Sequence, residues 1–366
     1  PKRNILLNPG PVTTTQKVKL AQIVPDICPR EEEFSDLMES VNQDLIKVIN
    51  GSEKTHCNVM FSGSGTASVE AVLTSCINSK ILLLINGSYG IRMKEILKTH
   101  GKPMEVLEFR NDKPIDFEVV NNFLENSKYV KYVAMVHHET TTGVLNSIHN
   151  FSKIRERFGV TLILDAISSY GGIPINIKKT PIQFLISSSN KCIQALPGLS
   201  FVLCERKALK EISKLPTHSY YLNLYDQYRF FKKYRQMRFT PPVQVFYALR
   251  TAINEYFEEG ILQRYARYTK NWEILRSGLI KLGFTLLLEE KDESHILLSV
   301  KEPDNPNFKF EIVHDELYKK GITIYPGKLS NENTFRIANI GDLDSIDMEN
   351  FIYELKNVLN KLSIKL

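Results

Sequence analysis

Val160-Thr-Leu-Ile-Leu-Asp165 is a run of β-branched and aliphatic residues that ends in a carboxylate. Ile182-Gln-Phe-Leu-Ile-Ser-Ser-Ser-Asn-Lys191 is a second apolar run, and it ends in polar groups and an amine. Both runs are typical of strands buried in a parallel sheet. Because ligands of such sheets bind outside the carboxyl ends of the strands, we expect Asp165 and Lys191 to open into one crevice.

A carboxylate and an amine in one crevice suit the chemistry of pyridoxal 5'-phosphate. The amine of Lys191 can form a Schiff base with the aldehyde of this cofactor. The carboxylate of Asp165 can pair with the pyridine nitrogen and keep it protonated, so that the ring withdraws electrons. The pair therefore predicts a pyridoxal-phosphate enzyme with Lys191 and Asp165 as its catalytic residues.

The phosphate of such a cofactor needs backbone N–H groups and hydroxyls, preferably at the start of a helix. Ser62-Gly63-Ser64-Gly65-Thr66 provides them, and the apolar positions that follow it have helical spacing. Most Gly/Ser tracts are ordinary turns. The segment is therefore a candidate phosphate site because it occurs together with Asp165 and Lys191.

Short motifs are distributed over most of the chain. They are Asn8-Pro-Gly-Pro11 with Thr13-Thr-Thr15, Gly63-Ser-Gly-Thr66, Asn86-Gly-Ser-Tyr-Gly90, His138-Glu-Thr-Thr-Thr-Gly143, Asp165-Ala-Ile-Ser-Ser-Tyr-Gly-Gly172, Ser188-Ser-Asn-Lys-Cys-Ile-Gln194, Arg238-Phe-Thr-Pro241 and Phe335-Arg-Ile-Ala-Asn-Ile-Gly341. In this order they resemble the class V aminotransferases of fold type I. The resemblance implies an α/β fold, with a large domain on a mainly parallel doubly wound sheet and a smaller α+β C-terminal domain.

The resemblance also implies a role for individual residues. Tyr89 would stack on the cofactor ring, and Thr140 would hydrogen-bond near the ring hydroxyl. The residues that would hold the phosphate are Ser64, Gly65, Thr66 and Asn190.

Two further assignments concern the substrate and a second subunit. Arg336 would clamp the acidic end of the substrate with its planar fork. Thr240 would reach the phosphate in the neighbouring subunit, which implies a homodimer with shared active sites. Met237 lies where some relatives have Tyr, and this puts their phosphate contact at that position in doubt here.

The resemblance is greatest to the branch that transfers the amino group of 2-aminoethylphosphonate to pyruvate. Transamination of alanine, serine or a phosphono amino acid stays open as an alternative within the family. Outside it, the alternatives are a silent interaction protein and a nucleic-acid binder using the basic and aromatic segment 228–235. Intact Lys191, Asp165 and Arg336 argue against silence, and we favour a solvated segment near the dimer contact for 228–235.

Composition sets the broad class. The chain has 366 residues, 43% of them hydrophobic, which leads us to expect two domains. Its net charge of +6 would suit a nucleic acid, but the basic residues are not concentrated in one stripe, so we expect no nucleic-acid partner and only modest steering of anionic substrates. The sequence has no long apolar run and no signal segment at its start, so we expect a cytoplasmic protein without a membrane partner. The first residue is not Met, which leaves open whether the chain is processed or cut from a longer polypeptide.

Three possible reactive or metal-binding features are interpreted as structural. The five cysteines form no C-x-x-C pair, so we expect reduced thiols, and Cys192 is expected to be buried rather than nucleophilic. His137 and His138 are adjacent, and adjacent strand residues point to opposite faces. They should not share a metal ion, and we expect a structural role or a place at the edge of the crevice.

Alternating strands and helices predict the domain layout: an N-terminal arm over 1–15, a large cofactor-binding domain over 16–250 and a small C-terminal domain over 251–366. Within the small domain we expect one long helix over about 251–282 and strands at 284–288 and 322–325.

Overall fold

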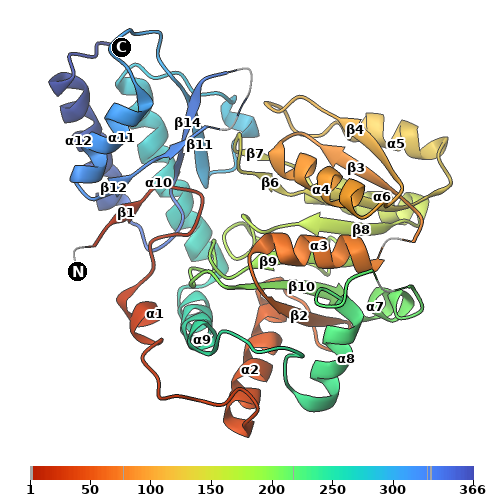
Figure 1. Ribbon diagram of the computed structural model, residues 1–366. Coiled ribbons are helices and arrows are strands. Elements are labelled where there is room, and N and C mark those ends of the chain that lie inside the picture. Colours follow the sequence, from red (N-terminus) through yellow and green to blue (C-terminus); the bar gives the residue numbers. More distant parts are fainter. Residues whose placement is uncertain (1–2, 77, 217, 328, 330–331) are drawn as a thin grey trace.

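A computed structural model describes residues 3–76, 78–216, 218–327, 329 and 332–366. Its centre is a seven-stranded sheet, parallel except for β10, which is antiparallel to both of its neighbours (Figure 1). The strands in spatial order are β2 (His56–Ser62), β10 (Leu199–Glu205), β9 (Phe184–Ser188), β8 (Thr161–Asp165), β5 (Val130–Val136), β3 (Lys80–Ile85) and β4 (Met104–Glu108). The expected doubly wound α/β fold is confirmed.

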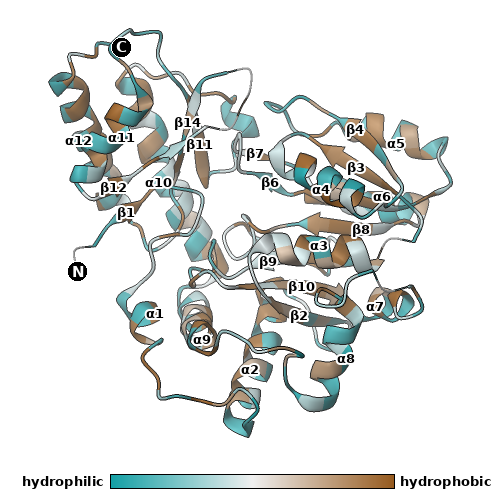
Figure 2. Ribbon diagram, in the orientation of Figure 1, coloured by the Kyte–Doolittle hydropathy of each residue, from teal (hydrophilic) through white to brown (hydrophobic). Residues whose placement is uncertain are grey.

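Helices cover both faces of this sheet. One core contains α3 (Gly65–Cys76), α4 (Ser88–Thr99), α7 (Arg206–Ile212) and α8 (Leu224–Tyr234), and the other contains α2 (Glu32–Val48), α5 (Phe117–Glu125), α6 (Ile148–Phe158) and α9 (Val243–Glu259). Alternate residues of β3 enter the two cores, with Leu83 in one and Leu84 in the other. The central strands are therefore hydrophobic throughout, whereas the helices are hydrophobic on one face (Figure 2).

The C-terminal part packs around its own core beside the large sheet (Figure 1). It contains α10 (Ile261–Lys281), the short helix η1 (Glu290–Asp292), α11 (Phe310–Lys319), α12 (Ser345–Lys361) and a sheet of β11 (Leu297–Lys301), β14 (Thr334–Ala338) and β13 (Tyr325–Pro326). The N-terminal strand β1 (Ile5–Leu6) pairs with β12 (Ile322–Thr323), whereas α1 (Gln16–Leu20) packs on α9. The N-terminal segment thus contacts both parts of the molecule, and the proposed domain limits at 15 and 250 stay predictions.

Three expected elements of the C-terminal part are wrong. The helix over 251–282 is two helices, because Gly260 adopts a φ of +84° that ends α9 and starts α10. The segment 284–288 makes only an isolated pairing of Leu286 with Val300. The strand over 322–325 is divided between two sheets, since its first half pairs with β1 and its end pairs with β14.

Within the described residues, no helix is long and apolar enough to cross a membrane.

Candidate active site

The loops after β3, β5, β8 and β9 surround a pocket of about 30 Å³. Four of the residues predicted for the site line it: Tyr89, Thr140, Asp165 and Lys191. His138, for which we expected a structural role or a place at the edge of the crevice, lines it too, and the structure adds Val136, Ile167 and Ser168, which the sequence did not single out. The expected meeting of Asp165 and Lys191 in one crevice is therefore confirmed.

Asp165 is the last residue of β8 and is 5% exposed. Its Oδ1 accepts a hydrogen bond of 2.9 Å from the backbone N–H of Ile167. Burial nevertheless raises the pKa of Asp165 to about 7, because the charged carboxylate is removed from water. A cation beside Asp165 would stabilise the charged carboxylate and lower its pKa again. A protonated pyridine nitrogen would be such a cation.

Lys191 follows β9 in a turn, and its side chain is partly buried. Its Nζ donates a hydrogen bond of 2.7 Å to the carbonyl oxygen of Pro9 in the N-terminal segment. The next residue, Gly10, lies so close that a Cβ placed on it would be 2.5 Å from Lys191 Cδ. The N-terminal segment therefore forms one wall around the lysine.

Tyr89 lies in the first turn of α4, beside the pocket. The guanidinium of Arg92 lies 4.7 Å from the centre of its ring. Its backbone N–H donates to Oε2 of Glu139 at 3.1 Å, and Oε1 of the same carboxylate accepts from the hydroxyl of Thr141 at 2.7 Å. Glu139 is completely buried, so desolvation raises its pKa above the usual range for Glu. This carboxylate fixes the start of α4 and with it the position of Tyr89.

The expected phosphate segment lies at the start of α3, which begins at Gly65. Gly63 has a φ of +149°, and a Cβ on Gly65 would lie 2.6 Å from the side chain of Ile167. Both glycines therefore allow a close backbone approach that larger residues would prevent. Thr66 accepts a hydrogen bond of 3.4 Å from Arg92, which adds a positive charge to this end of the site.

Asn190, the fourth expected phosphate ligand, lies beside Lys191 in the turn after β9. Its Oδ1 accepts from the hydroxyl of Ser188 at 3.0 Å. This bond orients the amide group.

Arg336 on β14 is completely buried. Its Nη1 and Nε donate hydrogen bonds of 3.0 Å to the carbonyl oxygens of Thr140 and Pro326. Its Nη2 is buried and has no hydrogen-bond partner among the described residues. Because two neutral carbonyls hold the guanidinium and Thr140 itself lines the pocket, one charged donor is left for a ligand.

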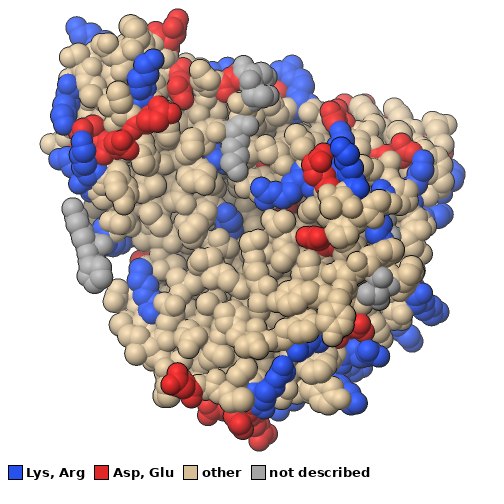
Figure 3. All heavy atoms as spheres, viewed as in Figure 1, with Lys and Arg blue, Asp and Glu red and all other residues tan. Residues whose placement is uncertain are grey.

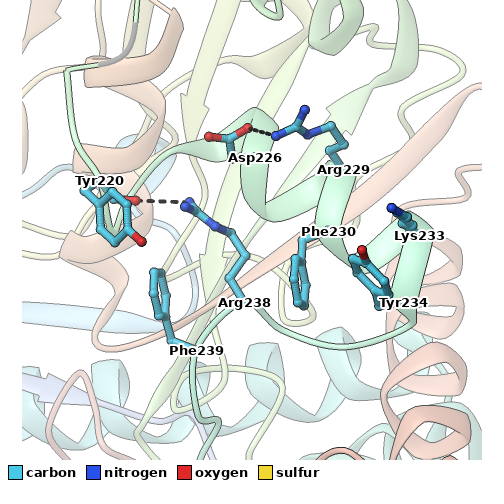
Figure 4. Close-up of a pocket in the computed structure, with 8 residues that line it drawn as sticks. All are labelled: Tyr220, Asp226, Arg229, Phe230, Lys233, Tyr234, Arg238 and Phe239. Carbon is cyan, nitrogen blue, oxygen red and sulfur yellow. Dashed lines mark hydrogen bonds and ion pairs between the residues drawn. The ribbon is translucent and has the colours of Figure 1, made fainter.

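Thr240 lies elsewhere. It is exposed, close in sequence to a hollow of about 520 Å³ that is separate from the Lys191 pocket. Figure 4 shows this hollow, where Arg238 donates a 3.0 Å bond to the carbonyl oxygen of Tyr220 and Arg229 pairs with Asp226. Met237 is buried. Within one chain the structure thus does not bring Thr240 to the Lys191 pocket, and its role across subunits stays a prediction.

Val136 and His138 line the pocket in a simple pattern with the predicted Thr140. Every second residue from the end of β5 to the residue after β6 (His138–Glu139) lines the pocket. Strand β6 pairs with β7 (Val144–Leu145) in a short hairpin. Extending the strand period of 2 past Val136 could have identified His138.

The two adjacent histidines bind different partners. Nδ1 of His137 lies 2.8 Å from the hydroxyl of Ser169, and Nδ1 of His138 lies 3.0 Å from the hydroxyl of Ser168. In the part of the chain that the structure describes, no group of three His, Cys, Asp or Glu side chains could hold a metal ion.

Cys192 is buried, as expected. Its thiol donates to the carbonyl oxygen of Ser168, and burial raises its pKa to about 12. A thiol of this kind is a poor nucleophile.

On the face shown in Figure 3, lysine and arginine side chains are interspersed with acidic ones. Nucleic-acid-binding proteins typically gather their basic side chains in a patch or stripe. The expectation of no nucleic-acid partner stays a prediction.

A doubly wound sheet with a lysine and an aspartate at its carboxyl edge defines the fold type I class of transferases. The chain belongs to the class-V aminotransferase family, whose family model matches residues 20–341. It is 36% identical to the 2-aminoethylphosphonate--pyruvate transaminase of Pseudomonas entomophila over 363 residues, which cover 98% of each chain. It is 37% identical to the protein of the same name from Phocaeicola vulgatus, covering 97% of this chain and 98% of the relative.

Solved structures show the same fold. The ureidoglycine-glyoxylate aminotransferase of Bacillus subtilis superposes with a TM-score of 0.91 at 21% identity, covering 99% of this chain and 94% of the other. The alanine--glyoxylate aminotransferase of Nostoc sp. gives a TM-score of 0.91 at 24% identity, covering 98% and 96%.

Proposed function

We propose that the protein transfers the amino group of 2-aminoethylphosphonate to pyruvate, giving phosphonoacetaldehyde and alanine, with pyridoxal 5'-phosphate as cofactor. The observation that supports this substrate pair most directly is the similarity over nearly full length to transaminases of that name. The geometry of the Lys191 pocket and the unpaired Nη2 of Arg336 agree with it.

The residues around the pocket fit the cofactor. Asp165 would pair with the ring nitrogen, Tyr89 and Ile167 would cover the ring, and Thr140 would contact its hydroxyl. The phosphate would lie at the start of α3, where Gly63 and Gly65 leave room for it. When bound, the cofactor supplies an aldehyde that takes up an amino group and a ring that withdraws electrons from the reacting carbon.

Lys191 is the proposed anchor and base. With the donor substrate bound, Nζ would be the base that takes a proton from the carbon that bears the donor's amino group and holds it for return within the site. That carbon has no carboxylate in 2-aminoethylphosphonate, so a C–H bond must break. The carbonyl oxygen of Pro9 gives Nζ a hydrogen-bond acceptor at this position.

Arg336 is the proposed binding group for both acidic ends. Its Nε and Nη1 are held by protein carbonyls, so the guanidinium is oriented before a substrate arrives. The free Nη2 would then bind the phosphonate of the donor in one half-reaction and the carboxylate of pyruvate in the other.

A donor panel tests the proposal. The purified protein with added pyridoxal 5'-phosphate is assayed with pyruvate as acceptor and 2-aminoethylphosphonate, serine or phosphonoalanine as donor, and with glyoxylate as acceptor for alanine. We expect a visible absorption band of bound cofactor and the highest kcat/KM with 2-aminoethylphosphonate. A higher value for serine or alanine would exclude the proposed substrate, and a protein that never acquires the band would exclude the cofactor.

A further inference from the structure

His138 is a titratable residue of the pocket that the proposed chemistry does not use. It is 2% exposed and lines the same pocket as Lys191 and Asp165. Its Nε2 is buried, and no residue in the described part of the chain forms a hydrogen bond with it. Buried polar atoms of native proteins are rarely left unpaired, so this atom indicates a partner that arrives with a ligand or with a movement of a neighbouring side chain.

The other ring nitrogen fixes the tautomer. The hydroxyl of Ser168 lies 2.9 Å from the backbone carbonyl oxygen of His138 and 3.0 Å from Nδ1 of the same residue. A carbonyl oxygen can only accept, so the single hydroxyl proton is directed to it. Nδ1 must then donate its own proton to the hydroxyl oxygen, which leaves Nε2 as an acceptor with a free lone pair.

The environment keeps this imidazole neutral. Burial lowers the pKa of His138 to about 3, and the positive charge of Lys191 acts in the same direction. The charged groups that line the pocket with it are Lys191 and Asp165, whereas Glu139 and Arg336 lie beyond Tyr89 and Thr140. At neutral pH, Nε2 is therefore available only to a hydrogen-bond donor.

We propose that His138 is a further active-site residue whose Nε2 accepts a hydrogen bond from the N–H of an amine nitrogen that the pocket handles. Two nitrogens have this chemistry: that of Lys191, which carries a proton both as the free ammonium and, when protonated, while joined to the cofactor aldehyde, and that of the donor substrate. The inference rests on the proposed function, because it takes Lys191 to be the cofactor anchor.

A hydrogen-bond acceptor beside an amine raises the pKa of the amine nitrogen, because it stabilises the protonated form. Loss of Nε2 of His138 should therefore lower the pKa of the nitrogen that it contacts. A hydrogen bond to a charged group typically corresponds to a shift of roughly one to two pKa units.

Amide side chains give matched variants. His138→Asn keeps a polar group at the position of Nδ1, next to Ser168, but has no atom at the position of Nε2. His138→Gln reaches the position of Nε2 and offers an oxygen acceptor there. His137→Asn is the control, since His137 is equally buried and bonded to a serine but does not line the pocket.

The measurement is a pH titration of the visible absorption band in the holoenzyme, followed by saturation of each half-reaction with 2-aminoethylphosphonate or pyruvate. If the amine is that of Lys191, His138→Asn lowers the pKa of the band by one to two units, and His138→Gln restores most of it. If the amine is that of the donor, the band is unchanged and saturation by 2-aminoethylphosphonate weakens 10-fold or more, whereas saturation by pyruvate does not. His137→Asn should change neither quantity.

The outcome that overturns the inference is a His138→Asn enzyme whose band and saturation match those of His137→Asn. Nitrogen-15 NMR of the histidine-labelled holoenzyme gives a second test that needs no variant to fold. A His138 ring protonated at Nε2 would also overturn the inference. A wild-type protein without a visible band would instead exclude the proposed function, so the two failures are distinguishable.

Discussion

Asp165 occupies a position where a carboxylate is unfavourable unless a cation is beside it. Its pKa of about 7 in the folded chain lies above its ordinary value of 3.8. A carboxyl group with a raised pKa leaves stability unaffected below pH 4 and lowers it as pH rises through 7, because the folded chain binds a proton that the unfolded chain has released. The difference of about three units corresponds to roughly 4 kcal/mol as an upper estimate.

Asp165→Asn should therefore stabilise the cofactor-free chain at pH 8, by as much as a few kcal/mol, and have little effect at pH 4. The same change should lower the rate about 10²–10³-fold, because an amide cannot hold the proton on the pyridine nitrogen and about 3–4 kcal/mol of transition-state stabilisation is lost. Urea unfolding at both pH values and single-turnover rates measure the two effects. Unchanged turnover with normal spectra would contradict the role of Asp165.

Lys191→Ala should abolish turnover and leave the fold intact, because one amine serves as both cofactor anchor and base. Borohydride reduction of the wild-type holoenzyme followed by peptide mapping should find the cofactor on Lys191. A stable adduct on a different lysine would disprove the assignment. Circular dichroism of the variant serves as the control for folding.

Arg336→Lys should impair both half-reactions. Lysine keeps the charge, but its ammonium group lacks the planar fork of the guanidinium. It cannot donate to the carbonyl oxygens of Thr140 and Pro326 and also place a donor where Nη2 of Arg336 lies. A lost charge-assisted bond of about 1.5–3 kcal/mol predicts roughly 10- to 100-fold weaker binding of the acidic group. Single-turnover titrations with 2-aminoethylphosphonate and with pyruvate measure the halves separately. If neither half slows, the acid-binding group lies elsewhere.

Residues differ in how far the sequence predicts them. Asp165 and Lys191 could be placed because each ends an apolar strand of a parallel sheet, and chain direction then fixes their common edge. The tertiary partners of Arg336 could not, since Thr140 and Pro326 come from separate parts of the chain. For His138 the sequence predicted no more than a structural role or a place at the edge of the crevice, because the doublet with His137 obscured the alternation with Val136 and Thr140.

At the scale of elements, the start of α4 depends on a carboxylate from another loop. Glu139 accepts from the backbone N–H groups of Tyr89 and Gly90 and from Thr141, and Gly87 packs directly on its side chain. The N-cap residue of this helix, Gly87, makes no side-chain hydrogen bond, and the backbone N–H of Ser88 donates instead to the hydroxyl of Thr141 at 3.4 Å. The position of the residue that would cover the cofactor ring is therefore set by an element outside its own helix.

Glu139→Gln should loosen this contact. One carboxylate oxygen becomes an NH₂ group that faces N–H donors, which leaves a buried donor unsatisfied at a cost of about 1–3 kcal/mol. We expect a lower midpoint in urea and a cofactor dissociation constant raised by the displacement of Tyr89. Thr141→Val removes one donor to the carboxylate and the acceptor of a long 3.4 Å bond from the backbone N–H of Ser88. It is the control and should have the smaller effect, because it leaves the carboxylate in place. Equal effects of the two variants would contradict the proposed role of the carboxylate.

Elements of the large sheet were predicted more accurately than those of the C-terminal part. Continuous apolar runs such as 81–85 were correctly predicted as strands, because a strand buried on both faces is apolar at every position. The division of the segment 322–325 was not predicted. Its two ends pair in different sheets, and its sequence does not show where one strand ends and the next begins. The break at Gly260 depends on a backbone conformation that one glycine permits but does not require.

At the scale of the whole molecule, the exposed position of Thr240 agrees with a site that two subunits complete. Thr240→Ala should weaken cofactor retention in a dimer that still forms. Mixing Thr240→Ala with Lys191→Ala gives a heterodimer in which one site carries both changes and the other carries neither, so activity should return. Sedimentation shows whether mixed dimers form. Inactive mixed dimers would disprove the prediction that Thr240 of one subunit acts in the active site of the other.

The contact between Gly10 and Lys191 links two distant parts of the gene. Any side chain at position 10 would occupy the space of the lysine's own methylene groups. Lys191 therefore limits which mutations the N-terminal segment can accept, although that segment contributes no reactive group. Relatives that keep a functional lysine at position 191 should therefore keep glycine at position 10. Substitutions of this glycine are expected only in relatives that have lost the lysine.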